Sequence, residues 1–120
     1  MTREEKQLLL KDLCARLPYG FTIYRLSDNA NLKINDINEF AHFLEYSDGE
    51  EFKPYLRSMS SMTAKEKTLM ATICLKYVSG NVEGAVSELS DFYNSRYFDY
   101  RGLIPMGLAL EAPDDMYKTK

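Results

Sequence analysis

Histidine, cysteine and tryptophan are scarce or missing in this chain of 120 residues, which has one histidine, two cysteines and no tryptophan. Zinc sites are usually built from cysteine and histidine at short, regular spacings. Cys14 and Cys74 have no such neighbours, so the sequence argues against a zinc site. Both lie in apolar helical patterns, and we expect them to be small buried side chains. A disulfide between them stays open at this stage.

The single histidine also limits nucleophilic catalysis. Any Ser-His or Cys-His pair would have to use His42, whose neighbours Ala41 and Phe43 offer no carboxylate to orient the ring. We therefore expect His42 to be a polar residue on a half-buried strand. The sequence predicts that the protein is not an enzyme and needs no cofactor.

Glycine-rich loops and long apolar runs are absent as well. The six glycines are scattered, so no phosphate-binding loop is recognisable. No apolar stretch approaches the roughly 18 residues of a membrane-spanning helix, and the charged start MTREEK does not resemble a signal peptide. We expect a cytoplasmic protein without a membrane partner.

The charge balance is ordinary, with a net charge of −3 and 28% charged residues. Without a basic excess, nucleic-acid binding is possible but not favoured. The acidic residues of the middle third lack the alternating ligands of a calcium loop and indicate a solvated face. Because 45% of the 120 residues are apolar, we expect residues 1–120 to form a single domain with one core.

Three helices are predicted from capping signals and helical spacing. Thr2 and Glu5 form a capping box for a helix over about 3–16, which Pro18 ends and whose outer face carries charged residues including Lys11 and Asp12. Thr63 and Glu66 repeat the capping box for a second helix that ends at Ser79 and Gly80, and Asn81 caps a third. The apolar faces are Leu69, Met70, Ile73, Cys74 and Tyr77 in the second helix, and Val82, Ala85, Val86, Leu89, Phe92 and Tyr93 in the third.

Between about residues 20 and 57 the apolar period changes from 3.6 to 2. Phe21 and Ile23 indicate one strand, Leu32 and Ile34 a second, and FKPYLR a third, in which Pro54 indicates a sheet edge. The sequence thus predicts an α+β domain: an N-terminal helix, a small antiparallel meander, two further helices and a C-terminal segment packed on them.

Residues 36–46 fit two patterns. Phe40, His42, Leu44 and Tyr46 alternate as in a strand, while Ile37, Phe40, Ala41 and Leu44 repeat as in a helix, with Asp36 and Glu39 as a possible capping box. Asp48-Gly49 is a hairpin signal directly before the next strand, so we predict a strand here.

Two stretches could form a binding site. In SMSSMT, the start of the second helix could hold an anion with help from Arg57. The favoured interpretation is a strand exit and helix cap with methionines turned into the core. In YNSRYFDYR, tyrosines alternate with arginines, as at protein interfaces and single-stranded nucleic-acid sites. A structural role is favoured over both, with Tyr93 and Phe98 in the core, Asp99 paired with a nearby arginine and tyrosine rings over the helix end. The candidate binding residues are Tyr55, Arg57, Tyr97, Asp99, Tyr100 and Arg101.

Three segments, KDLCARLPYG, KPYLRSMSSMT and FDYRGLIPMGLALEAP, resemble a family of small proteins from gut bacteria of the Bacteroides type and from their phages and mobile elements. The resemblance implies a bacterial accessory protein, and it brings no activity, cofactor or catalytic residue. The most favoured function is a non-enzymatic module that binds an unknown protein. The alternatives are a small single-stranded nucleic-acid-binding domain and, with less support, a small enzyme for an anionic ligand. Homo-oligomerisation is open.

Overall fold

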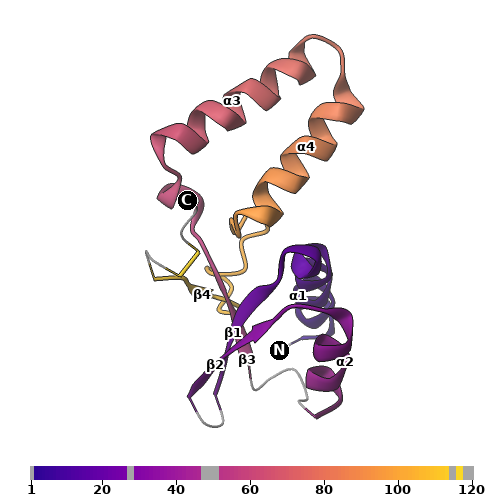
Figure 1. Cartoon of the computed structure of the whole chain (residues 1–120), viewed down its shortest axis with the longest axis vertical. Coiled ribbons are helices and arrows are strands. Elements are labelled where there is room, and N and C mark those ends of the chain that lie inside the picture. Colours follow the sequence, from indigo (N-terminus) through magenta and orange to yellow (C-terminus); the bar gives the residue numbers. More distant parts are fainter. Residues whose placement is uncertain (1, 27–28, 47–51, 114–115, 118–120) are drawn as a thin grey trace.

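Four helices and a four-stranded sheet make up the fold (Figure 1). The computed structural model describes residues 2–26, 29–46, 52–113 and 116–117, and of residues 42–46 the backbone only. The elements are α1 (Arg3–Arg16), β1 (Phe21–Arg25), β2 (Ala30–Ile34), α2 (Ile37–Tyr46), β3 (Phe52–Leu56), α3 (Ala64–Val78), α4 (Val82–Ser95) and β4 (Leu110–Glu111), with short 3-10 turns at Leu17–Tyr19 and Met59–Ser61. The predicted α+β class is confirmed.

The helix starts predicted from capping signals are confirmed. In α1 the Thr2 hydroxyl accepts from the Glu5 amide while the Glu5 carboxylate accepts from the Thr2 amide. Thr63 and Glu66 make the same reciprocal pair in α3. Asn81 begins α4 by accepting from the Gly84 amide. Each cap satisfies amides that the first helical turn leaves without intrahelical partners.

The strand order is β2-β1-β3-β4. β1 is antiparallel to β2 and to β3, which confirms the antiparallel pairing, and β4 adds a parallel partner to β3. The strands do not follow the predicted meander, because β3 pairs with β1 rather than with the strand before it. The prediction of an edge strand is wrong for Tyr55 and Leu56, which pair with β4. Pro54, one residue earlier, pairs with Ile23 of β1. The sequence did not indicate that a distant segment returns to cover this strand.

The predicted strand at residues 36–46 is wrong, because this segment is the helix α2. The Asp36 carboxylate accepts from the Glu39 amide, and the Glu39 carboxylate accepts from the Asn35 amide, so the capping signal decided the conformation. Phe40 is buried and meets Phe21 edge-on, with ring centroids 5.6 Å apart. His42 therefore lies on a helix rather than a strand, and the hairpin signal at 48–49 falls outside the described residues.

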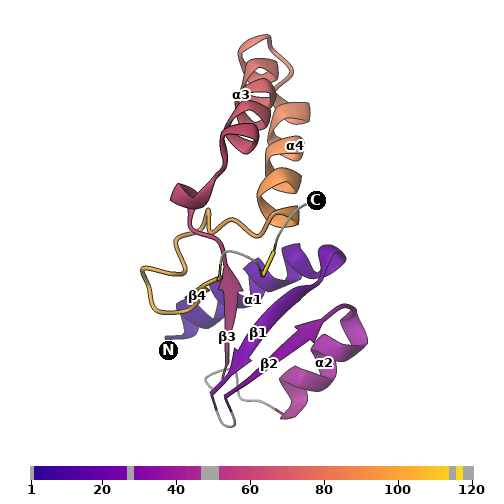
Figure 2. The ribbon, with the colours of Figure 1, turned by 60° about the vertical axis from the view of Figure 1, so that its left-hand side comes forward.

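One core fills the space between the sheet and the helices α1 and α2 (Figure 2). Its buried residues are Leu9, Leu13, Phe21, Ile23, Ile34, Phe40, Phe52, Leu56, Leu103, Leu108 and Ala109. Gly20 enters β1 in a left-handed conformation with φ of 74°, and a Cβ there would lie 3.2 Å from the Ile34 carbonyl oxygen. The prediction of buried cysteines is wrong: Cys14 and Cys74 are both exposed, and both are free thiols.

The helices α3 and α4 form an antiparallel hairpin that points away from the sheet (Figures 1 and 2). The hairpin explains the elongated shape, whose principal extents are 48 × 28 × 26 Å. A second cluster of buried residues, Met62, Phe92 and Phe98, lies where the hairpin joins the sheet. Among the described residues, no helix is both long enough and apolar enough to span a membrane.

Candidate functional site

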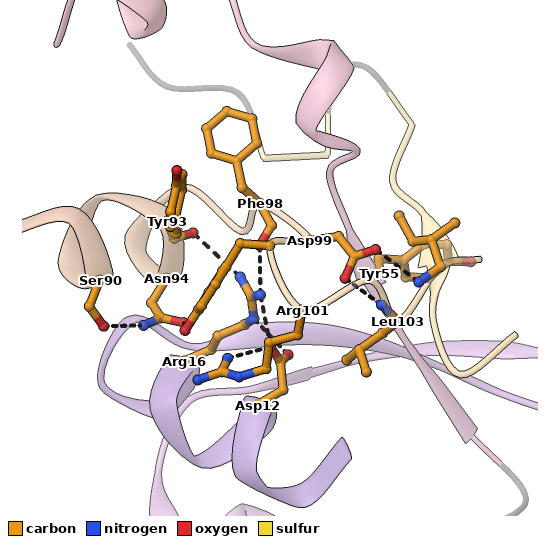
Figure 3. Close-up of polar contacts among 12 residues, drawn as sticks. Asp12, Arg16, Tyr55, Ser90, Tyr93, Asn94, Phe98, Asp99, Arg101 and Leu103 are labelled. Carbon is orange, nitrogen blue, oxygen red and sulfur yellow. Dashed lines mark hydrogen bonds and ion pairs between the residues drawn. The ribbon is translucent and has the colours of Figure 1, made fainter. Parts of the chain in front are cut away.

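The predicted site residues gather where the hairpin meets the sheet, a region that we call the junction. Figure 3 labels three of them, Tyr55, Asp99 and Arg101. Arg57 directly follows β3, and the segment 97–101 follows α4. The Arg57 amide donates to the Tyr97 carbonyl at 2.7 Å, and the Asp99 amide donates to the Arg57 carbonyl at 2.8 Å. These two bonds form a parallel bridge between Arg57 and Phe98 and bring both sequence stretches into one place.

The Arg57 side chain is fully engaged inside the junction. Its guanidinium donates to both carboxylate oxygens of Glu66, at 2.8 and 2.7 Å, and lies 4.3 Å from the ring centroid of Phe98. Glu66 thus occupies the start of α3, where the sequence suggested a bound anion. Met62 is buried as the structural interpretation requires, whereas Met59 is exposed and contradicts it.

Glu66 links acid stability to the junction. Hydrogen bonds from Arg57, together with those from Thr63, lower the pKa of Glu66 from 4.5 to about 2. Because the pKa of Glu66 is lower in the folded state than in the unfolded state, the ionised carboxylate stabilises the fold fully above about pH 4.5. That contribution is lost as the pH falls toward 2.

We expect Glu66→Gln to lower the free energy of unfolding at pH 7 by about 3 kcal/mol, the size of such a pKa shift. The difference from the unaltered protein should shrink between pH 4.5 and 2, as urea unfolding followed by circular dichroism would show. Glu4→Gln, at an exposed position of α1, is the control. A deficit that stays constant with pH would contradict this assignment.

A second arginine cluster links α1 to the junction. Asp12 and Arg16 are both fully buried and form a bidentate pair, with N–O distances of 2.8 and 2.9 Å. Arg101 donates to the same Asp12 carboxylate at 2.7 Å, and Figure 3 shows both guanidinium groups directed at it. The prediction that Asp12 belongs to the outer face of its helix is therefore wrong.

Arg16 also closes the end of α4. It donates to the Phe98 carbonyl at 2.7 Å and, over a longer 3.4 Å, to the Tyr93 carbonyl. The Tyr93 carbonyl lies in the last turn of α4, where carbonyl groups carry partial negative charge, so a buried cation is favoured there. Arg16 of α1 thus holds the segment that follows α4 against α1.

Asp99 and Tyr100 are likewise used within the chain. The Asp99 carboxylate accepts from the amides of Leu103 and Ile104, at 2.7 and 2.9 Å, so the predicted pairing with an arginine is wrong. The Tyr100 ring stacks on Tyr93 with centroids 4.9 Å apart. The carboxylate holds the turn that follows Asp99, and the stacked rings cover the end of α4.

Tyr97 adopts a conformation unusual for a large side chain, with φ of 64°. It occupies the position after a helix end where glycine is common, and the Phe98 amide bonds back to the Tyr93 carbonyl. Its ring stacks on Tyr117 with centroids 3.8 Å apart, and its hydroxyl donates to the Tyr19 carbonyl at 2.8 Å. These contacts offset the cost of the left-handed backbone.

The Tyr117 hydroxyl lies between two strands. It accepts from the Thr22 amide at 2.9 Å and donates to the Tyr55 carbonyl at 3.0 Å. The register that pairs Ile23 with Pro54 would place Thr22 opposite Tyr55, so the hydroxyl substitutes there for direct pairing of β1 and β3. Burial raises the pKa of Tyr117 to about 12.

Tyr55 belongs to the outer face of the sheet, opposite the core. Its ring meets Tyr24 edge-on at 6.4 Å, and its hydroxyl donates to Asn31 at 3.0 Å. Strand alternation places Lys33 and Lys53 on the same face. The sequence alone does not show that Lys33 and Lys53 share a face with Tyr55, because that depends on the register between the strands.

The six candidate residues therefore meet in or beside the junction, and each makes a polar or ring contact within the chain. These contacts give them a structural role, and their predicted role in binding stays a prediction.

A different surface carries exposed apolar side chains, bordered at its base by Met70 and Tyr93, which pack against the buried cluster of Met62, Phe92 and Phe98. One side of the hairpin, which we call the hairpin face, carries apolar side chains from both helices. Its members are Met70, Cys74, Val78, Val82, Val86 and Tyr93. Val78 is 80% exposed, and Val86, which belongs to the predicted apolar face of α4, is 57% exposed.

The described residues contain no group of three or more His, Cys, Asp or Glu side chains placed to hold a metal ion. No protein-family model, curated protein or solved structure matches the chain significantly. The candidate function accordingly rests on this geometry.

Proposed function

We propose that this protein is a non-enzymatic interaction module that binds a protein partner through the hairpin face. The observation that carries the proposal is the exposure of Val78 and Val86, at 80% and 57%, on a hairpin that projects from the sheet. Exposed apolar side chains are unremarkable singly, but a contiguous group on one surface is typical of an interaction site. Six members from two helices form such a group.

The junction supports this proposal because it holds the hairpin in place. Arg57 and Glu66 tie the start of α3 to β3, and Arg16 ties the end of α4 to α1. A surface held in its binding conformation loses less entropy on association than a mobile one does. The arginines and tyrosines that resembled binding residues thus serve binding indirectly, by positioning the hairpin.

The base of the hairpin face offers anchors for a partner. The Tyr93 hydroxyl contacts the Met70 sulfur at 3.5 Å, and both side chains are half-buried. Aromatic rings and methionine are enriched in the cores of protein interfaces, whereas lysine and glutamate are depleted there. A partner that covers this base and extends toward Val78 would bury the apolar rows of both helices.

A second candidate function, single-stranded nucleic-acid binding, is favoured by the outer face of the sheet. Tyr24 and Tyr55 lie there with Lys33 and Lys53, and the strands β1, β2 and β3 contain no Asp or Glu. Tyrosine rings can stack on bases while lysines contact phosphates. It ranks second because the net charge of the chain is −3.

The test is affinity capture from a bacterial lysate with the tagged protein and the double variant Val78→Glu/Val86→Glu. Glutamate is a better helix former than valine, so α3 and α4 should persist, which circular dichroism can check. Ile37→Glu, at a residue 61% exposed on α2, is the matched control. We expect a protein retained by the unaltered chain and by the control, after nuclease treatment, and lost from the double variant.

Retention that the double variant does not change would overturn the proposal. Retention that disappears with nuclease, and with Tyr24→Ala/Tyr55→Ala, would instead establish the second candidate.

A further inference from the structure

We infer that the partner of the hairpin face is a second copy of this chain. The inference rests on the proposed function, because it names the partner of the same surface. It is carried by a juxtaposition: Lys67 and Glu83 lie at diagonally opposite corners of an otherwise apolar face.

Helical spacing defines the two apolar rows. Met70, Cys74 and Val78 recur every four residues along α3. Val82 and Val86 are likewise four apart on α4. The rows share one side of the hairpin, since the Tyr93 hydroxyl of α4 contacts the Met70 sulfur at 3.5 Å and Tyr93 follows Val86 by seven residues, or two helical turns.

The other side of the hairpin is polar. Lys76 of α3 and Glu88 of α4 form an ion pair across it, at 2.6 Å. Lys76 follows Cys74, and Glu88 follows Val86, by two residues. Two residues turn about 200° around a helix, so both charges lie opposite the hairpin face. Lys65 precedes Lys67 by two residues, so it too lies on the side opposite the hairpin face. The hairpin is therefore two-sided, with one ion-paired side and one apolar side.

Only two charged residues of α3 and α4 remain beside the apolar rows. Lys67 precedes Cys74 by seven residues, which places it on the same side near the junction, where α3 begins. Glu83 precedes Val86 by three residues and lies at the tip, where α4 begins. Both are exposed, and neither forms an ion pair among the described contacts.

This arrangement is self-complementary. In a two-fold dimer both subunits use the same surface, so a residue that contacts a second residue of the partner is itself matched by the reciprocal contact. A two-fold axis that exchanges the two corners places each Lys67 against Glu83 of the other copy, twice per dimer. The apolar rows then face each other, and no like charges meet.

The first test uses the unaltered protein. Sedimentation equilibrium across micromolar concentrations should show a monomer–dimer transition. Over the same range, the dimer should protect Cys74 from a thiol reagent, because it lies within the hairpin face. Cys14, exposed on α1, should react equally at every concentration and serves as the internal control.

The second test reverses the charges. We expect Lys67→Glu alone, and Glu83→Lys alone, to weaken the dimer by about tenfold or more, because each creates two like-charge contacts. An equimolar mixture of the two variants should restore a heterodimer, since glutamate at 67 then meets lysine at 83. Lys65→Glu and Glu4→Lys, at exposed positions outside the face, are the matched controls.

A monomer at all concentrations, equal labelling of both cysteines, or a dimer unaffected by these reversals would overturn the inference. If the chain is monomeric but the hairpin variants still lose a different captured protein, the proposed function holds and only the identity of the partner is wrong. If the dimer forms and no other capture depends on the hairpin, both stand together.

Discussion

Replacing Arg16 with Ala is expected to lower the free energy of unfolding by about 3–5 kcal/mol, the cost of breaking a buried ion pair by removing one partner. Arg16 is fully buried and donates to Asp12 and to the Phe98 carbonyl. The truncated side chain would leave the Phe98 carbonyl with the Tyr100 amide as its donor, and Asp12 with Arg101 alone. Urea unfolding followed by circular dichroism would measure the loss.

Two further variants of α1 make this measurement specific. Arg3→Ala changes an exposed arginine of the same helix and should alter stability by no more than about 0.5 kcal/mol. Arg16→Lys keeps the charge but not the planar fork that reaches both Asp12 and the Phe98 carbonyl, so we expect it to recover only part of the stability. If Arg16→Lys had the stability of the unaltered protein, the positive charge alone, and not the guanidinium geometry, would account for the stabilisation.

Phe98→Ala is expected to cost a similar amount, about 3–5 kcal/mol, through lost burial and the cavity left behind. Phe98 is fully buried, stacks on Phe92 with centroids 5.8 Å apart, and lies under the Arg57 guanidinium. It therefore contacts both the hairpin and the chain that leaves β3. We expect the same unfolding experiment to show a lowered midpoint, with a smaller loss for Phe98→Leu.

Tyr77→Ala is the control for Phe98, because Tyr77 is an aromatic residue that is 56% exposed near the tip of the hairpin. Its removal should change stability by no more than about 0.5 kcal/mol. Equal losses at the two positions would contradict the assignment of Phe98 as the central contact of the junction.

Local signals predicted the parts of the fold that depend on neighbouring residues. The capping boxes at Thr2 and Thr63, and the cap at Asn81, each involve residues three apart, so the sequence alone determined where α1, α3 and α4 begin. Asp36 and Glu39 carry the same capping signal, but the Asp48-Gly49 hairpin signal nearby favours a strand, and for this reason the sequence prediction for α2 is wrong.

The site depended on contacts between distant residues. The bond from Arg16 to Phe98 joins residues 82 positions apart, and the one from Arg101 to Asp12 joins residues 89 apart. No periodicity indicates such pairs, so Asp12 was assigned to the outer face of its helix. The exposure of the α4 valines could not be predicted for a different reason: an apolar stripe has the same pattern whether it packs within the chain or against another molecule.

The hairpin is made from a continuous stretch, whereas the sheet is not. Its two helices are joined by three residues, but the bond between Tyr117 and Thr22 closes a separation of 95 residues. Local contacts form fast and distant ones slowly. We therefore expect the hairpin to form first when the unfolded chain refolds, so that its apolar side is exposed to other chains before the sheet is complete.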